Sequence, residues 1–284
     1  MRGRVLIVAG SDSGGGAGIQ ADIKTVTMFG AFAMTAVTAL TAQNTRGVTR
    51  IVPVDPDFVE EQMRAVLLDL GADAVKTGML LGADVVRCVA RAIAALAPQA
   101  HLVVDPVMVA KGGARLLEDD AREALLTELV PNATLVTPNV LEVEILTGRV
   151  VRNEGDLEAA ADRLLALGAR AVLVKGGHLE GPRLVDLLKT REGAVHRFVA
   201  ERAETRSTHG TGCTLASGIA AGLSQDLTLP EAVARAHAYV QRAIRTAPGL
   251  GVGHGPLNHA HPLEDLIEQV EAFNATDAGA SQSK

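Results

Sequence analysis

Residues 4–22 read RVLIVAGSDSGGGAGIQAD, in which a short apolar run passes into a glycine-rich loop and then into a helical pattern. The run Val5–Ala9 is aliphatic throughout, as a strand buried on both faces of a sheet would be. It is too short for the apolar core of a signal peptide, and no cleavage-site pattern follows it. The stretch therefore predicts a buried parallel strand that leads through a loop into a helix.

The same alternation of apolar runs and amphipathic helical patterns continues along most of the chain. It predicts an α/β fold with three layers (α/β/α), in which helices cover both faces of a mostly parallel central sheet. Two alternating runs, Leu184–Leu188 and Ala194–Val199, flank a turn and predict an edge hairpin. The predicted strands are Arg4–Ala9, Phe32–Ala39, Ala74–Lys76, Leu102–Asp105, Thr134–Val136 and Ala171–Val174. The predicted helices are Asp57–Leu70, Ala83–Leu96, Asp119–Leu129, Asp156–Leu167, Cys213–Leu223 and Pro230–Thr246.

The composition suits one α/β domain and argues against several kinds of partner. Hydrophobic residues make up 48% of the 284 residues but aromatic ones only 2%, so the core must be mainly Ala, Val, Leu and Ile. The net charge of −6 comes from interspersed charges, and without a basic face or aromatic platforms a nucleic-acid partner is not expected. No apolar stretch approaches the ~20 residues of a membrane-spanning helix.

The two cysteines, Cys88 and Cys213, give neither a disulfide framework nor a zinc-ligand spacing. We therefore expect a soluble protein in the cytoplasm. No linker divides the chain, which predicts a single domain over residues 1–272. The small, polar residues 273–284 are expected to form a disordered tail.

A second glycine-rich segment, THGTGCT at residues 208–214, opens the apolar helix predicted from Cys213. Small residues at a helix start leave first-turn N–H groups available to a phosphate or a developing anion. Because Cys213 lies at this positive end, we expect its thiolate to be favoured over that of free cysteine. The alternative is a small buried side chain at a tightly packed helix start; Cys88 is expected to be a core residue of its own helix.

The glycine-rich loop at residues 10–18 is open to three interpretations. Its N–H groups could face a ligand, it could be a flexible turn, or it could belong to the loose dinucleotide pattern at residues 16–21. A nicotinamide-dependent oxidoreductase would need an acidic residue about twenty positions later to hold the ribose. Residues 33–39 contain none, and no Gly-Lys-Ser/Thr of a Walker P-loop occurs in the sequence.

Polar residues end or follow three further predicted strands, where ligands of an open α/β sheet bind. Asp105 ends one strand, while Asn139 and Glu142 follow another; together they could arrange Mg²⁺ beside nucleotide phosphates, largely through its waters. The second pair fits a helix cap equally well, with Asn139 as N-cap and Glu142 as its capping-box partner. Lys175 ends the third strand, where it could meet a phosphate or simply be solvated.

Taken together, these segments resemble the hydroxymethylpyrimidine/phosphomethylpyrimidine kinases of thiamine biosynthesis, a family of the ribokinase superfamily. The resemblance covers about Val5 to His261. Gln43 and the cysteine of Gly-Thr-Gly-Cys are specific to it, since sugar kinases of the superfamily generally carry Asp there; Gly14 and Gly113 depart from it, since Ser is usual. The matching segments are AGSDSGGGAGIQAD (9–22), TALTAQNTRG (38–47), VKTGM (75–79), VDPVMVAK (104–111), TPNVLE (137–142), VKGGH (174–178), THGTGCT (208–214) and GHGPLN (253–258).

The resemblance implies a ribokinase-like kinase that uses ATP and Mg²⁺. It would phosphorylate 4-amino-5-hydroxymethyl-2-methylpyrimidine and then its monophosphate to the diphosphate, and it would be a homodimer. Pyridoxal kinase activity, sole or additional, is the alternative, since some relatives accept both. A noncatalytic vitamin-precursor binder is a third candidate, which would keep Gln43 but need neither Lys175 nor the anion loop.

Family roles carry over to matching positions of this chain. The catalytic set is Cys213 as base, with Gly210, Thr211 and Gly212 as the anion hole. The pyrimidine set is Gln43, Gly10, Met79 and Val107. Lys175, Asn139 and Thr211 would bind ATP, and Asp105 and Glu142 would arrange the metal.

Residue chemistry agrees with two of these roles. A glutamine amide can pair at once with the acceptor nitrogen and the amino donor of an aminopyrimidine, and Met79 offers a polarizable apolar surface to a ring. The glycines of Val109–Ala114 fit a mobile flap over the substrate, or an ordinary loop. His254, His259 and His261 are interpreted as structural.

Overall fold

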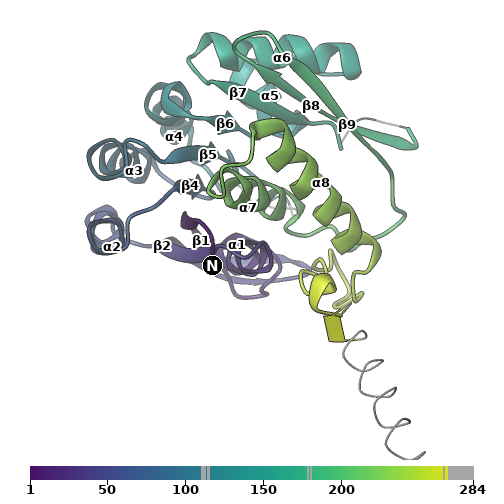
Figure 1. The fold of residues 1–284 in the computed structure, drawn as a ribbon, viewed down its shortest axis with the longest axis horizontal. Helices are drawn as coiled ribbons and strands as arrows, with labels where there is room; N and C mark the ends of the chain where they lie inside the picture. Colours follow the sequence, from purple (N-terminus) through teal and green to yellow (C-terminus); the bar gives the residue numbers. More distant parts are fainter. Residues whose placement is uncertain (110–112, 114–115, 178, 180, 265, 268–284) are drawn as a thin grey trace, which may run out of the picture.

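The computed structural model describes residues 1–109, 113, 116–177, 179, 181–264 and 266–267. Within them runs a nine-stranded sheet with the order β3-β2-β1-β4-β5-β6-β7-β8-β9 (Figure 1). Neighbouring strands from β2 to β7 pair in parallel, which confirms the predicted mostly parallel sheet. These parallel strands are β1 (Arg4–Asp12), β2 (Phe32–Asn44), β4 (Ala74–Thr77), β5 (His101–Val104), β6 (Leu135–Val136) and β7 (Ala171–Lys175).

Both edges of the sheet are antiparallel. At one edge β8 (Arg183–Thr190) and β9 (Val195–Glu201) form the predicted hairpin. At the other, β3 (Gly47–Pro53) pairs antiparallel with the far part of β2, and a register shift falls between Ala42 and Gln43. The predicted end of this strand at Ala39 is wrong, because the continuation to Asn44 is held by pairing with β3, and at Leu40 and Thr41 also with β1, rather than by apolar burial.

Helices cover both faces of the sheet, which confirms the three-layer prediction. In Figure 1, α1, α7 and α8 lie on one face and the remaining helices on the other. The helix predicted at 119–129 is α4 followed by a π-helical turn at Leu125–Leu129. The α-helices that cover the sheet are α1 (Gly18–Met28), α2 (Pro56–Asp69), α3 (Ala83–Leu96), α4 (Asp119–Ala124), α5 (Val140–Thr147), α6 (Glu154–Ala166), α7 (Thr211–Leu223) and α8 (Leu229–Arg245).

Strand β1 shows why the sheet is filled with aliphatic residues. Leu6 and Val8 pack into the core cluster beneath α2 to α6, whereas Val5, Ile7 and Ala9 pack into the cluster beneath α7 and α8. All five side chains are almost completely buried. Since successive side chains point to opposite faces, a strand between two helical layers must be apolar at every position.

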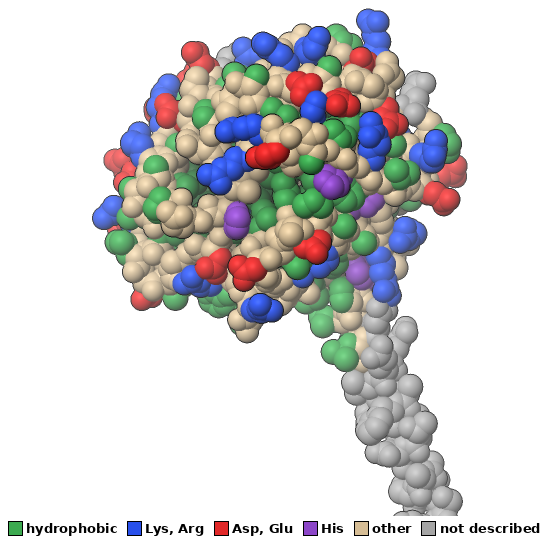
Figure 2. Space-filling view, turned by 45° about the horizontal axis from the view of Figure 1, so that its top comes forward, with side chains coloured by type: hydrophobic (Ala, Val, Ile, Leu, Met, Phe, Trp, Pro, Cys, Tyr) green, Lys and Arg blue, Asp and Glu red, His purple; other side chains and the backbone are tan. Residues whose placement is uncertain are grey.

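Figure 2 shows acidic and basic side chains interspersed over the face in view. Within the described ranges, every helix is too short or too polar to cross a membrane. The predicted tail at 273–284 and most of the predicted flap, Val109–Ala114, lie outside the described residues.

Candidate active site

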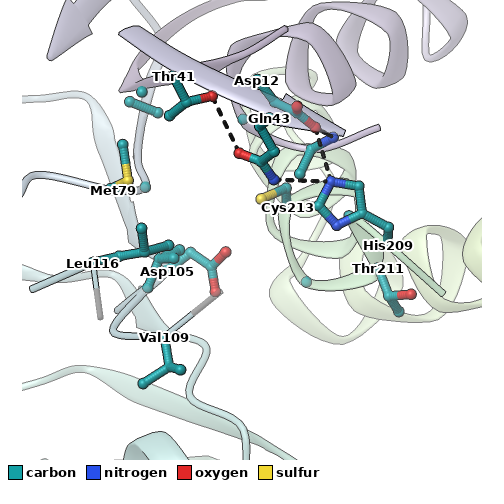
Figure 3. A pocket seen from close by; sticks show the side chains of 18 of the residues that line it. Asp12, Thr41, Gln43, Met79, Asp105, Val109, Leu116, His209, Thr211 and Cys213 are labelled. Atoms are coloured by element: carbon teal, nitrogen blue, oxygen red, sulfur yellow. Dashed lines mark hydrogen bonds and ion pairs between the residues drawn. The ribbon is translucent and has the colours of Figure 1, made fainter. Parts of the chain in front are cut away.

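A pocket lies beyond the carboxyl ends of the parallel strands, against the start of α7 (Figure 3). Parallel strands direct their carboxyl ends to one edge of the sheet, so residues far apart in sequence meet there. The pocket is lined by every site residue that the sequence predicts: Gly10, Gln43, Met79, Asp105, Val107, Asn139, Glu142, Lys175, Gly210, Thr211, Gly212 and Cys213.

The start of α7 is shaped by Gly210. This residue is the N-cap, in the left-handed region with φ 83°, and a Cβ added there would lie 1.8 Å from the carbonyl oxygen of Gly16. Only glycine fits such a position. Because Gly210 has no side chain with which to cap the helix, the first-turn N–H groups of α7 stay available to an anion in the pocket.

The glycine-rich loop between β1 and α1 is different, because it binds a carboxylate of its own chain. Asp12 accepts hydrogen bonds from the N–H groups of Gly14 (2.8 Å), Gly16 (3.1 Å) and Ala17 (2.8 Å), and its Oδ2 lies 2.8 Å from His209 Nε2. Burial raises the pKa of Asp12, but these hydrogen bonds outweigh it and hold that pKa below its ordinary value. The N–H groups that a dinucleotide would need are therefore occupied.

Gln43 comes from the polar extension of β2 and is fixed at its backbone and side chain. Its N–H donates to Ser13 Oγ at 2.8 Å, and that hydroxyl lies 2.9 Å from the Gln43 carbonyl oxygen. Its amide lies between Thr41 Oγ1 at 3.2 Å and His209 Nε2 at 3.3 Å, as Figure 3 shows. Gln43 therefore lies in the pocket in a constrained position.

Met79, which follows β4, contributes apolar surface to the same pocket and approaches Gly10 closely. A Cβ added to Gly10 would lie 2.3 Å from Met79 Cε, so the missing side chain makes room for the thioether. Leu116 and Ala39 pack with Met79, and Val107 packs against this small cluster. The wall that they form suits the face of a planar ring.

On the other side of the pocket, Lys175 carries a positive charge beside two carboxylates. Its Nζ lies 3.0 Å from Asp105 Oδ1 and 3.9 Å from Glu142 Oε2, and Thr137 donates to Asp105 at 3.1 Å. Burial opposes the charge of Lys175, but the two carboxylates raise its pKa above the ordinary value. A Cβ added to Gly212 would lie 3.1 Å from Lys175 Nζ, so this cation adjoins the start of α7.

Asn139 and Glu142 form the capping box of α5, which confirms the capping alternative. Asn139 Oδ1 accepts the Glu142 N–H at 3.0 Å, and Glu142 Oε2 accepts the Asn139 N–H at 2.8 Å. Burial raises the pKa of Glu142 to about 7, against the opposing effect of Lys175. Among the described residues, no group of three or more His, Cys, Asp or Glu side chains is placed to hold a metal ion.

The expectation that the helix start favours the Cys213 thiolate is wrong. Burial raises the pKa of Cys213 to about 12, and the nearby carboxylates of Asp22 and Asp105 add to this rise. Lys76 and the Gly18 N–H lower the pKa, but less than burial raises it. The free-energy cost of removing a thiolate from water exceeds the stabilisation that the helix start and one cation give to the thiolate.

The sequence analysis assigned no role to four charged or titratable residues at this site: Lys76, Asp22, Asp12 and His209. Fully buried Lys76 lies 2.9 Å from both carboxylate oxygens of Asp22, which also accepts a hydrogen bond from Ser217 at 2.7 Å. A lysine inside the apolar strand Ala74–Thr77 was the available signal, since a buried charge needs a partner. The others, Asp12 and His209, stood inside the two glycine-rich segments without an assigned role.

Comparisons with known proteins point to one family. Residues 12–258 match the family model described as phosphomethylpyrimidine kinase. The chain is 53% identical over 268 residues to a thiamine biosynthesis bifunctional protein of Geobacter sulfurreducens; the match covers 94% of this chain but 54% of that protein. It is 48% identical over 259 residues to a hydroxymethylpyrimidine/phosphomethylpyrimidine kinase of Rhizobium meliloti, covering 90% of this chain and 96% of the relative.

A solved structure of pyridoxal kinase from Bacillus subtilis, in complex with ADP, has a similar fold. Its TM-score is 0.84 at 34% sequence identity, and the match covers 92% of this chain and 98% of that one.

Proposed function

The chain belongs to the phosphomethylpyrimidine kinase family, and on that premise we propose that it phosphorylates 4-amino-5-hydroxymethyl-2-methylpyrimidine with ATP and then converts the monophosphate to the diphosphate. It is a kinase of thiamine biosynthesis. The observation that carries the proposal for its site is the meeting, in one pocket, of Gln43, the uncapped start of α7 and Lys175.

The start of α7 would bind the terminal phosphate of ATP. The N–H groups around Gly210, Thr211 and Gly212 would face the charge that develops during transfer, and Lys175, whose Nζ lies beside Gly212, would add a cation. Asn139, at the start of α5, would complete the nucleotide side of the pocket. Phosphoryl transfer depends mainly on alignment and charge stabilisation, which fixed amides and a lysine supply.

The pyrimidine would bind between Gln43 and the wall that Gly10, Met79 and Val107 form. The amide offers one donor and one acceptor to the edge of the ring, and the apolar wall covers its face. This orientation would direct the hydroxymethyl group toward Cys213.

Asp105 and Glu142 would hold Mg²⁺, mainly through water. Mg²⁺ is commonly bound by one or two protein carboxylates together with substrate phosphates, so a site without a third acidic ligand fits it. When bound, the ion would neutralise phosphate charge. Lys175, 3.0 Å from Asp105 Oδ1, holds that carboxylate toward the phosphate side of the pocket.

Cys213 would accept the proton of the substrate hydroxyl late in the reaction. A loose transition state needs little deprotonation early, so transfer can begin before the proton moves. To accept that proton, Cys213 must by then be a thiolate, so its own proton would leave to solvent as the complex assembles. Asp105 is one of the carboxylates that raise the pKa of Cys213. Neutralising Asp105 in the assembled complex would therefore favour the thiolate.

The direct test is to incubate the protein with ATP, Mg²⁺ and the hydroxymethylpyrimidine and to resolve the products by mass. We expect the monophosphate first and the diphosphate later, with two ADP formed per diphosphate. If no ADP forms at saturating pyrimidine, the protein is a noncatalytic binder and the proposal is wrong.

Pyridoxal is the second candidate substrate, because the fold and 34% of the aligned sequence match a pyridoxal kinase. Turnover of pyridoxal and of the pyrimidine, measured side by side, separates the two. A higher kcat/KM for pyridoxal would replace the proposed substrate.

We also propose one kinase domain over residues 1–272 that acts as a homodimer in the cytoplasm, as the family resemblance implies. The shared nine-stranded sheet supports one domain. Light scattering in solution would test the dimer, and a monomer at micromolar concentration would contradict it.

A further inference from the structure

A chain of hydrogen bonds runs through the Gln43 side chain, from the Asp12 carboxylate to the Ser11 carbonyl oxygen. We propose that Asp12, His209 and Thr41 fix which end of the Gln43 amide points in which direction, and that this makes the pocket select a 4-aminopyrimidine over a 4-oxopyrimidine. The inference rests on the proposed function and names the device that sets its specificity. None of the three is a catalytic residue; each is a positioning residue.

The first step fixes the proton of His209. The Asp12 carboxylate accepts three backbone N–H groups, from Gly14, Gly16 and Ala17, so it acts as an acceptor. His209 Nε2 lies 2.8 Å from its Oδ2 and must therefore be the nitrogen that carries hydrogen.

The second step concerns the near end of the amide. Gln43 Nε2 and His209 Nε2 lie 3.3 Å apart, but two N–H donors cannot bond to each other. Turning the amide by 180° exchanges its oxygen and nitrogen, which have nearly the same shape. The oxygen then accepts from His209, which shares its hydrogen between Asp12 and Gln43.

The third step reaches the same orientation from the far end. Thr41 Oγ1 lies 2.9 Å from the Ser11 carbonyl oxygen and 3.2 Å from the amide of Gln43. A hydroxyl has one hydrogen, and a carbonyl can only accept it, so that hydrogen goes to Ser11. The Thr41 oxygen is left as an acceptor and needs an N–H from Gln43, which the turned amide supplies.

Both ends therefore demand the same orientation, with the Gln43 nitrogen toward Thr41 and its oxygen toward His209. One N–H and one oxygen lone pair remain for a ligand, in a fixed spatial order. The bonds of the Gln43 backbone to Ser13 hold the residue in place, and a half-turn of the amide would lose its bonds to both Thr41 and His209.

This order distinguishes two closely similar rings. In a 4-aminopyrimidine the ring nitrogen beside the amino group accepts and the amino group donates. In the 4-oxo analogue the ring nitrogen donates and the oxygen accepts. A freely turning glutamine would serve both, whereas a fixed one leaves the second ring with two unpaired contacts, and unpaired buried polar groups are what make a site selective.

The test compares kcat/KM for the 4-amino substrate and for 5-hydroxymethyl-2-methylpyrimidin-4-one. We expect the wild-type protein to favour the amino compound by roughly 10²-fold or more. Thr41→Val keeps the shape but removes the acceptor, so the preference should fall about tenfold. Thr41→Ser restores the hydroxyl and should restore the preference. An unchanged preference in Thr41→Val would overturn the inference.

A second variant and a second measurement keep the result independent of folding. His209→Phe removes the donor at the other end and should also lower the preference, while KM for ATP reports whether the neighbouring start of α7 is intact. Neutron diffraction of the wild-type protein should place the Gln43 deuterium atoms on the side of Thr41. Deuterium on the side of His209 would contradict the inference, whereas failure of the wild type to phosphorylate the amino compound would contradict the proposed function instead.

Discussion

Two glycine-rich segments open helices in this protein, and they differ in what their N–H groups bind. Before α1, the N–H groups of Gly14, Gly16 and Ala17 are held by Asp12. At α7, Gly210 brings no capping side chain. A glycine-rich helix start is thus open to a ligand only where the chain does not supply its own anion. We call the first segment the filled loop (residues 12–17) and the second the open loop (residues 209–213).

The open loop also has lysine side chains near it, whereas the filled loop contains the carboxylate of Asp12. Lys175 adjoins Gly212 of the open loop, and Lys76 acts on the Cys213 thiol. A negative group arriving in the pocket would therefore meet N–H groups and the Lys175 ammonium at the open loop, beside the Asp105 and Glu142 carboxylates that Mg²⁺ would neutralise, while the filled loop already contains a carboxylate. The following experiments test whether this contrast governs activity and stability.

The largest expected effect is that of removing the cation of the open loop. Lys175→Met should lower kcat by roughly 10²–10³-fold, as loss of one preorganised charge-stabilising group does. Rates of ADP formation at saturating ATP and pyrimidine measure this. Lys189→Met is the matched control, because Lys189 pairs with Glu158 and Asp162 away from the pocket, and it should leave kcat within about twofold. A decrease in kcat of less than tenfold in Lys175→Met would contradict the claim that the open loop and its lysine stabilise the transferred phosphate.

Cys213→Ala should lower kcat by about 10²-fold, at the lower end for a positioned base, because the wild-type thiol is protonated at neutral pH. KM for the pyrimidine should stay within about threefold, since Gln43 and the apolar wall remain. Cys88→Ala, a buried change in α3, is the control and should leave kcat unaltered. An unchanged kcat in Cys213→Ala would remove the proposed role.

The filled loop should matter for stability. Asp12→Asn replaces an acceptor by an amide group that faces three backbone donors and His209, so we expect the free energy of unfolding to fall by about 1–3 kcal/mol. Urea denaturation gives the value. Asp73→Asn loses an exposed ion pair with Arg4 and should cost about 0–1 kcal/mol. Equal losses in the two variants would show that Asp12 has no special role in its loop.

The smallest effect concerns pH. Burial raises the pKa of Glu142 to about 7, so between pH ~4.5 and ~7 the unfolded chain loses this proton first, and the wild-type unfolding free energy falls as pH rises. Glu142→Gln cannot ionise. The melting temperature of Glu142→Gln minus that of the wild type should therefore be larger at pH 8 than at pH 5, by roughly a few degrees.

Scanning calorimetry of both proteins at the two pH values measures that difference. Glu128→Gln, a change of an exposed glutamate in the turn after α4, is the control. A relative melting temperature for Glu142→Gln that is the same at both pH values, or that falls, would contradict the burial argument.

Much of the fold could be predicted because its signals are local. The aliphatic run of β1, the alternation of strands and helices, and the small residues at the start of α7 each follow from neighbouring positions. The extension of β2 to Asn44 could not be predicted in this way. Its residues, Leu40 to Asn44, are mixed in character and mostly not buried, and pairing with β3, and at Leu40 and Thr41 also with β1, makes them a strand.

The sequence indicated which residues line the pocket, but it did not indicate their protonation states. The strand ends indicated where Asp105 and Lys175 would meet, because a parallel sheet has one ligand-binding edge. The pKa of Cys213 depends on burial and on Lys76 and Asp22, which approach each other only after folding. Local spacing at a helix start carries no information about such tertiary effects.

The most direct test of the account is a crystal structure with Mg²⁺, the pyrimidine and a nonhydrolysable ATP analogue. We expect the terminal phosphate to lie within hydrogen-bonding distance of the N–H groups at Gly212 and Cys213, with Lys175 beside it and the filled loop still bound to Asp12. A terminal phosphate held by the N–H groups of Gly14, Gly16 and Ala17, or far from both loops, would contradict it.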